Sequence, residues 1–190
     1  MLICAFCVVC IAVVIAFIAT IQLPDFDNFE NRNIANSTKI YDRTGKIVLY
    51  NIHDNVRRTA VPIEEISPYI QKGTISIEDV YFYEHFGFRP TAFIRAIIAN
   101  IQSGGYSQGG STINQQVIKN ALLTRDKTIS RKLKEIILSI KLDSELPKDT
   151  ILQIYLNESP YGGTIYGVEE ASLTYFNKKA RDVNLTEAAY

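Results

Sequence analysis

The pattern of apolar and polar residues divides the chain into two parts. Residues 2–23 are predominantly apolar and include no charged side chain, and this length is just sufficient for a helix to cross a bilayer. Beyond residue 62, apolar residues recur three or four positions apart, which is the spacing of helices that bury one face. The pattern predicts a mostly helical domain behind a membrane anchor.

The N-terminal run has one alternative interpretation, a cleaved signal peptide. The run is longer than the apolar region of a signal peptide, and no small-x-small cleavage site precedes Asp25. No Lys or Arg precedes the run, so charge gives no orientation, and we expect the true N-terminus to lie upstream. Cys4, Cys7 and Cys10 lie in the run without His or carboxylate, which favours packing or lipid contact over a metal site.

A linker and a short β element follow this run. Residues 24–37 are polar and aperiodic, whereas residues 38–51 alternate around the turn from Asp42 to Gly45, which is typical of a β-hairpin. We therefore expect an anchor over residues 1–23, a linker with a hairpin over residues 24–61, and a helical domain over residues 62–190.

Several helix-start signals lie in the third region. Ser67 is a predicted N-cap with Pro68 at the first helical position, and Pro90 is predicted at the first position of a second helix. Thr112 with Gln115 forms a capping-box pattern. The final segment NLTEAAY is typical of the first turn of a further helix. The six longer helices are predicted over residues 67–82, 89–102, 113–123, 128–146, 146–157 and 167–178.

Composition indicates a folded protein and disfavours a general nucleic-acid binder. Apolar residues make up 47% and charged residues 21%, and the formal net charge is zero. From Lys119 to Lys134, however, the sequence contains six basic residues and only one acid, Asp126. This run suits either an anionic ligand or lipid headgroup, or the solvated face of a helix.

Glu78 is the first candidate catalytic group. If its helix continues, Glu78, Phe82 and His85 are spaced to share one face. Burial beside aromatic rings would raise the pKa of the carboxyl toward the range of a general base. The alternative is a surface acid at a helix end.

Glu135 is the second candidate. The main apolar stripe of its predicted helix is Leu133, Ile136, Ile137 and Ile140, which we expect to face the core. Glu135 lies nearly opposite this stripe, one turn after Arg131, on a side that also carries leucines. A helix that is apolar on two sides is buried on two sides, so Glu135 is expected to line a cleft or interior with Arg131 as its partner. The alternative is a surface pair worth about 0.3 kcal/mol.

The segment SQGGSTINQQVIKN, residues 107–120, lies between the two acids. Its glycines permit close backbone approach before a helix N-terminus, Ser111 and Thr112 offer hydroxyls, and free N–H groups favour a phosphate. Lys119 and Lys127 add positive charge. The Gly-Lys-Ser/Thr ending of a P-loop is absent, and a flexible loop before a capped helix is the alternative.

Five segments in order resemble the motifs of peptidoglycan glycosyltransferases, the lysozyme-like family 51 domain of class A penicillin-binding proteins and monofunctional transglycosylases. The resemblance covers most of the chain from Pro62 to Tyr190, and the hairpin also resembles the segment before this domain in bifunctional proteins. The five segments are EDVYFYEHFG, GGSTINQQVIKN, RKLKE, KDTILQIYLN and GVEEASLTYFNK.

The resemblance implies polymerisation of lipid II by inverting transfer at the outer face of the cytoplasmic membrane, with undecaprenyl pyrophosphate as leaving group. By position, Glu78 is the implied base for the acceptor hydroxyl, and Glu135 is the implied second glutamate that assists the donor or its pyrophosphate. The implied partners are lipid II, the growing glycan chain, the membrane and cell-wall synthesis proteins, with no nucleic acid. The implied substrate-binding residues are Phe82, His85, Ser111, Thr112, Gln115, Gln116, Lys119, Lys127, Arg131 and Lys132.

The chain departs from the family pattern at a few positions. Arg89 stands where the family usually has Asp, and Asn177 and Ser172 replace Gly and Ala in the fifth motif. The helix that begins in LTEAA continues in the family, so the resemblance implies a truncated C-terminus and leaves open a following transpeptidase domain. The expected fold is mainly α: a lysozyme-like glycosyltransferase domain behind an N-terminal transmembrane helix, with a short β-hairpin between them.

Two other functions stay open at this stage. A lysozyme-like glycan-cleaving enzyme would not require the STINQQVIKN segment or the basic run, and an inactive membrane-tethered scaffold would not require both acids. No cofactor is required by the sequence. Asp79 with the two glutamates leaves open a Mg²⁺ or Mn²⁺ ion that bridges a pyrophosphate.

Overall fold

A computed structural model describes residues 38–44, 48–52, 57–105, 109–121 and 128–190. The predicted anchor, most of the linker and Lys127 lie outside the described residues. Within the described part of the chain, no helix is both long enough and apolar enough to cross a bilayer.

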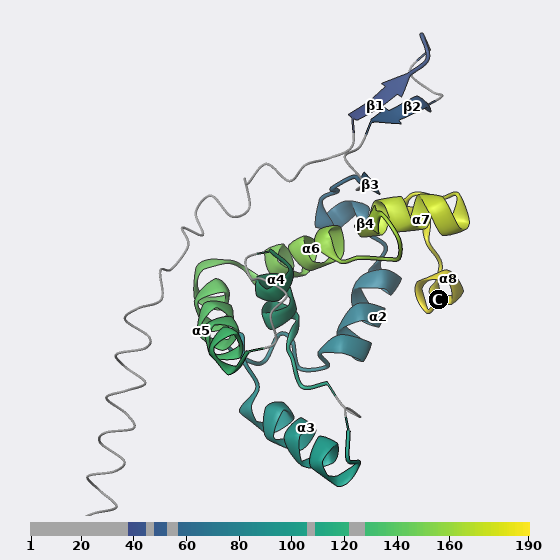
Figure 1. Ribbon diagram of the computed structural model, residues 1–190. Coiled ribbons are helices and arrows are strands. Elements are labelled where there is room, and N and C mark those ends of the chain that lie inside the picture. Colours follow the sequence, from purple (N-terminus) through teal and green to yellow (C-terminus); the bar gives the residue numbers. More distant parts are fainter. Residues whose placement is uncertain (1–37, 45–47, 53–56, 106–108, 122–127) are drawn as a thin grey trace, which may run out of the picture.

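The described part is mainly helical, which confirms the predicted class (Figure 1). The starts at Ser67 and Pro90 are confirmed: the Ser67 hydroxyl accepts a hydrogen bond from the Tyr69 N–H, and each proline occupies the first helical turn. The helices are α2 (Pro68–Glu78), α3 (Pro90–Gln102), α4 (Ile113–Ala121), α5 (Ile129–Glu145), α6 (Lys148–Glu158), α7 (Val168–Phe176) and α8 (Leu185–Ala188), with 3-10 turns η1 (Ile63–Glu65) and η2 (Ala180–Asp182).

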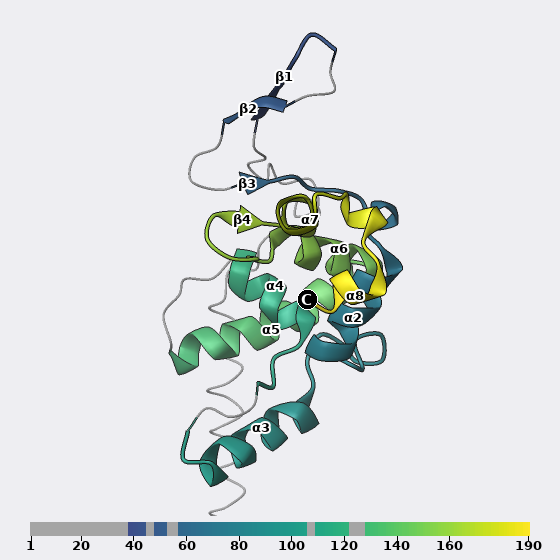
Figure 2. The ribbon, with the colours of Figure 1, turned by 90° about the vertical axis from the view of Figure 1, so that its right-hand side faces the viewer.

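The predicted hairpin is present. Strand β1 (Thr38–Tyr41) pairs antiparallel with β2 (Val48–Ile52). In the turn, the Thr44 hydroxyl donates a 2.6 Å hydrogen bond to the Asp42 carboxylate. Both views place the hairpin at the end of the molecule opposite α3 (Figures 1 and 2).

A second, shorter pairing attaches the segment that enters the helical body. Strand β3 (Arg57–Arg58) runs parallel to β4 (Ile165–Tyr166). Nearby, the Asn157 side chain accepts a 3.0 Å bond from the Val61 N–H and donates a 2.8 Å bond to the Val61 carbonyl. A Cβ at Gly167 would lie 2.7 Å from the Asn157 carbonyl oxygen, so this approach requires glycine. Two-residue strands carry no sequence period, and the sequence did not predict them.

The core lies where α4 packs against α5 and α6 (Figure 1). Complete burial of an aliphatic or aromatic side chain contributes about 1.5–3 kcal/mol, so this cluster contributes strongly to the stability of the helical body. Its fully buried side chains include Phe82, Ile113, Ile118, Leu142, Ile151, Leu152 and Leu156.

The predicted core face of α5 is only partly correct. Ile136 and Ile137 are partly buried, and Ile137 packs against the core. Leu133 and Ile140 are 45% and 44% exposed, whereas the buried residues of α5 are Glu135, Leu138, Ser139 and Leu142. The helix has two apolar sides, and periodicity alone does not decide which of them packs on α4. The outcome places Glu135 on the buried side.

Helix α3 packs against the body through small residues. Its buried residues are Ala92 and Ala96, and Gly110 lies so close that an added Cβ would come within 2.9 Å of the Ala92 carbonyl oxygen. The apolar spacing of α3 predicts a buried face, but its isoleucines are exposed instead: Ile94, Ile97, Ile98 and Ile101.

The departures in the fifth motif are accommodated locally. Asn177 ends α7 in the left-handed region at φ 53°, a conformation that glycine adopts freely and asparagine tolerates. Ser172 is buried and its hydroxyl donates a 2.7 Å bond to the Val168 carbonyl one turn earlier. At the end of the chain, Asn184 and Glu187 form a capping box that begins α8, as the NLTEAAY pattern predicts.

Candidate active site

Glu78 is the last residue of α2, so the predicted continuation of this helix is wrong. Asp79 leaves the helical region, with φ −159° and ψ 76°. Phe82 then turns into the core at 0% exposure, and the largely buried His85 side chain faces Asp79. Glu78 is exposed. The three residues therefore share no helix face, and the burial expected for Glu78 is absent.

Asp79 fixes the loop that follows Glu78. Its carboxylate is buried and lies 2.7 Å from His85 Nε2, 3.2 Å from the Ile113 N–H and 3.5 Å from an Arg89 guanidinium nitrogen. An ionised carboxylate only accepts hydrogen bonds, so His85 Nε2 carries the proton in this contact. A buried charge is tolerated only with such partners. Asp79, which the sequence left undecided, thus attaches the loop to the N-terminus of α4.

The predicted capping box at the start of α4 is confirmed. The Thr112 N–H donates to the Gln115 side-chain oxygen at 2.9 Å, and the Gln115 N–H donates to the Thr112 hydroxyl at 3.2 Å. The same hydroxyl donates a 2.7 Å bond to the Gly87 carbonyl. Both side chains are buried. These two implied substrate-binding residues therefore maintain the frame of the site.

Glu78 itself faces α4 and α6. The Gln116 amide donates a 2.7 Å hydrogen bond to its carboxylate. Burial, and after it the charge of Glu78, raises the pKa of Tyr155, and the pKa of Tyr161 is raised by burial, Tyr155 and Glu78 in that order. The charge of Glu78 thus helps to keep these two phenols neutral, and its own exposed side chain can be reached by an incoming molecule.

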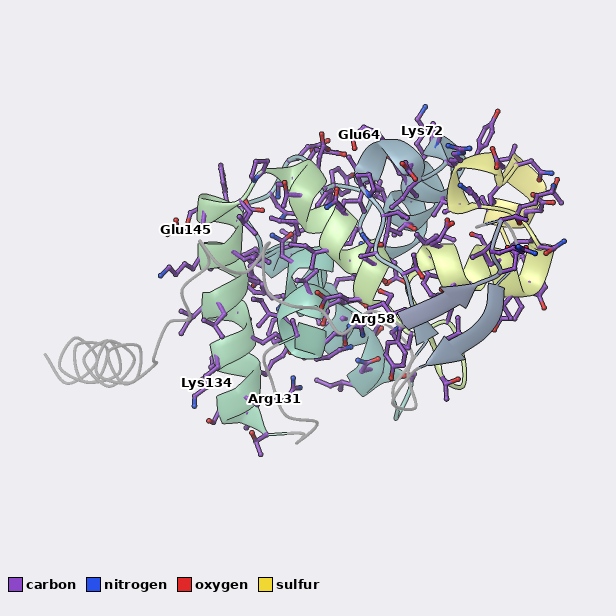
Figure 3. The ribbon with its side chains drawn as sticks, turned by 90° about the horizontal axis from the view of Figure 1, so that it is seen from above. Arg58, Glu64, Lys72, Arg131, Lys134 and Glu145 are labelled. Atoms are coloured by element: carbon purple, nitrogen blue, oxygen red, sulfur yellow. The ribbon has the colours of Figure 1, made fainter. Side chains whose placement is uncertain are left out.

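Glu135 has the opposite surroundings. It is 1% exposed, with Arg131 at 2.8 Å and Lys132 in a second ion pair. Lys132 also donates a 2.8 Å bond to the Ser111 hydroxyl. The predicted pairing of Glu135 with Arg131 in an interior site is confirmed. In Figure 3, Arg131 and Lys134 lie at the end of α5 away from Glu145.

A cleft of about 530 Å³ opens over this ion-pair cluster, between α3 on one side and α4 and α5 on the other. Lys119 lies three positions after Gln116 on α4, so the cleft and Glu78 adjoin along that helix. The cleft combines one buried acid, three cations and an apolar wall. Its lining residues are Phe93, Ala96, Ile97, Asn100, Gly110, Ser111, Lys119, Arg131, Lys132 and Glu135.

The structure therefore separates the implied substrate-binding residues into two groups. One group lines the cleft or contacts Glu78: Ser111, Gln116, Lys119, Arg131 and Lys132. The other is buried in the supporting frame: Phe82, His85, Thr112 and Gln115. Lys127 lies outside the described residues.

The sequence alone did not identify Lys148 as a supporting residue. Its ammonium donates a 2.7 Å bond to the His85 carbonyl, pairs with Asp143 and lies 4.9 Å from the centre of the Phe82 ring. Lys148 is the first residue of the KDTILQIYLN segment, which is the signal that could have indicated it. It holds the loop after Glu78 against α6.

The residues left open for Mg²⁺ or Mn²⁺ are not arranged around a common ion. Among the described residues, no group of three His, Cys, Asp or Glu side chains could hold a metal. Asp79 and Glu135 both face cationic partners instead. These surroundings do not fit a divalent cation.

Comparisons with known proteins show the family of this chain. The sequence profile of the transglycosylase family matches residues 45–190. Penicillin-binding protein 1F of Bacillus subtilis (strain 168) is 42% identical over 153 residues, 80% of this chain and 21% of that protein. Penicillin-binding protein 1A of Aquifex aeolicus (strain VF5) is 39% identical over 167 residues, 88% of this chain and 23% of that protein. Penicillin-binding protein 1A of Neisseria lactamica is 37% identical over 167 residues, 88% of this chain and 21% of that protein.

The chain belongs to the transglycosylase family, which confirms the resemblance drawn from its five motifs. It spans about a fifth of the length of these curated relatives.

Proposed function

We propose that this chain is a peptidoglycan glycosyltransferase that polymerises lipid II into glycan strands in bacterial cell-wall synthesis. The observation that carries the proposal is the contrast between its two acids. Glu78 is exposed beside a neutral amide, whereas Glu135 is buried between two cations in an adjoining cleft. Membership of the transglycosylase family supports this assignment.

Glu78 is the proposed general base. A sugar hydroxyl of incoming lipid II attacks the anomeric carbon of the growing chain from the face opposite the pyrophosphate. Glu78 accepts the hydroxyl proton as the new C–O bond forms, and the bond to the pyrophosphate oxygen breaks with its electron pair. Such a transfer inverts the anomeric configuration and needs one base directed at the nucleophile.

The cationic cleft is the proposed site of the departing pyrophosphate. Arg131 and Lys132 more than neutralise Glu135, and Lys119 adds a third positive charge to the lining. Guanidinium and ammonium groups are the side chains that bind phosphate oxygens most strongly, and charge placed in advance at the leaving group lowers the barrier to its departure. Glu135 is proposed to hold these cations in position.

The proposal includes a lysozyme-like fold. It also places the reaction at the membrane surface, because both implied substrates carry a lipid. The uncharged run at residues 2–23 supports a single-pass anchor. The extracytoplasmic placement of the helical domain rests on the family resemblance, because charge gives no orientation here. The exposed isoleucines of α3 support a second contact with the apolar layer.

The test is a lipid II polymerisation assay on the full chain in vesicles. Glu78→Gln is expected to reduce polymer formation by at least about a thousandfold, the range that a missing base explains. Glu84→Gln, an exposed acid in the loop after Glu78, is the matched control and should retain activity. Undiminished polymer from Glu78→Gln would overturn the assignment of the base. Release of fragments from added glycan strands would indicate a cleaving enzyme, and a folded chain without either activity would indicate a scaffold.

A further inference from the structure

The geometry points to Arg89 as a positioning residue for Glu78, an inference that rests on the proposed role of Glu78 as the base. Arg89 stands where the family pattern usually has Asp. It lies eleven positions after Glu78 and does not contact that carboxylate in any described interaction. It acts instead on Asp79, the residue directly after Glu78, and on Tyr81, two positions further along the chain.

The Arg89 side chain contacts this loop at two points. One guanidinium nitrogen lies 3.5 Å from an Asp79 carboxylate oxygen, and the guanidinium carbon lies 4.3 Å from the centre of the Tyr81 ring. The side chain is only 17% exposed. A planar, permanently charged group suits both contacts, because it can pair with a carboxylate and stack on a ring. Lysine would keep the positive charge but lacks a planar group that can stack on the Tyr81 ring.

Asp79 transmits this contact to the base. Its carboxylate also accepts the Ile113 N–H at the start of α4, and one turn later Gln116 donates to Glu78. The same helix therefore holds both adjacent acids. Arg89 and His85 hold Asp79 from its other sides. Loss of Arg89 leaves the buried Asp79 carboxylate with one fewer cation, and the most direct relief is a shift of Asp79 together with the adjoining Glu78.

The competing role for Arg89 is that of an ordinary helix cap. Arg89 occupies the N-cap of α3, yet its side chain makes no capping hydrogen bond. Aspartate is among the best N-cap residues and also suits the positive end of the helix dipole. A capping role therefore predicts that Arg89→Asp is neutral or stabilising. A positioning role predicts the reverse, since a second carboxylate would then face Asp79.

The decisive experiment is steady-state polymerisation of lipid II by the full chain. Arg89→Asp is expected to lower kcat at least tenfold with less than a twofold change in KM, and Arg89→Gln to lower kcat severalfold. Arg89→Lys should recover part of the rate. Arg95→Asp reverses an exposed charge on α3 and should leave kcat unchanged. Wild-type kcat in both Arg89→Asp and Arg89→Gln would overturn the inference.

Two further measurements separate this inference from failure of the proposed function. In an Asp79→Asn background, Arg89→Gln should have no additional effect on kcat, because the ion pair through which Arg89 positions Glu78 is already absent. Hydrogen exchange of the Ile113 amide should accelerate in Arg89→Gln relative to the Ile151 amide of α6. That comparison needs no activity, so it remains decisive if the wild-type chain does not polymerise lipid II. Equal exchange at Ile113 in wild type and Arg89→Gln would reject the positioning role.

Discussion

The side chain of Gln116 donates a 2.7 Å hydrogen bond to the carboxylate of Glu78, and this contact joins the end of α2 to the exposed side of α4. The preceding residue, Gln115, is fully buried and caps the same helix. Two adjacent glutamines in one motif therefore have separate tasks. Gln115 fixes the helix, and Gln116 orients the acid.

Removal of the Gln116 amide should impair the rate without harming the fold. Gln116→Ala is expected to lower kcat/KM about fivefold, the equivalent of about 1 kcal/mol for a hydrogen bond to an exposed charged group. The measurement is the initial rate of lipid II polymerisation. Gln102→Ala, an exposed glutamine at the end of α3, is the control. Equal rates for both variants would show that Gln116 does not orient Glu78.

Glu135→Gln should destabilise the protein as well as reduce its activity. The change leaves Arg131 and Lys132 without their buried anionic partner, and breaking a buried ion pair costs about 3 kcal/mol. The partial exposure of both cations reduces this to about 2 kcal/mol. Urea unfolding of Glu135→Gln and Glu145→Gln, the latter at the exposed end of the same helix (Figure 3), provides the comparison. Equal midpoints for the two variants would contradict it.

These residues also show what the sequence could and could not predict. The pairing of Glu135 with Arg131 was predictable because i, i+4 neighbours meet on any helix. The side of α5 that faces the core was not, because two apolar sides compete for the same contact. Likewise, the capping box of Thr112 and Gln115 is local and was predicted. The end of α2 at Glu78 depends on Asp79 meeting Ile113, thirty-four positions later, and local patterns do not contain such contacts.

High pH should destabilise the folded chain through ionisation of Tyr161. Burial of its hydroxyl, then Tyr155 and Glu78, raises its pKa above the usual range, so the folded chain keeps a proton that the unfolded chain loses above a pKa of about 10. The stability contributed by Tyr161 is fully present below that pH and is lost as the pH rises toward the folded pKa. Tyr161→Phe should therefore flatten the alkaline decline of Tm.

The control for Tyr161 is Tyr69→Phe, which changes a half-exposed tyrosine. Its Tm should follow the wild-type decline. An identical alkaline slope for wild type and Tyr161→Phe would mean that the Tyr161 phenol does not resist ionisation in the folded state.

The exposed isoleucines of α3 should affect interaction with lipid more than stability. Ile98 and Ile101 are 49% and 75% exposed, so serine at both positions should change the free energy of unfolding by less than about 1 kcal/mol. Half-burial of each side chain in an apolar layer contributes about 1 kcal/mol. Both changes together remove about 2 kcal/mol, so we expect the double variant to raise the apparent KM for lipid II in vesicles about thirtyfold. Ile140→Ser changes an isoleucine of α5 that is 44% exposed, close to the exposure of Ile98, and should not raise KM. A matching rise there would contradict a specific role for α3.

The attachment of the entering segment has a mechanical consequence. Any pull transmitted along the chain from the N-terminal side reaches the folded body first at the β3–β4 pair and at the Asn157 contact with Val61. Parallel strands loaded from one end share the force across their hydrogen bonds, and both contacts are supported by α6 and the loop before α7. The loop between Glu78 and Arg89 takes no part in either of these contacts. Force at this attachment would therefore act on contacts other than those that hold Glu78 and Glu135.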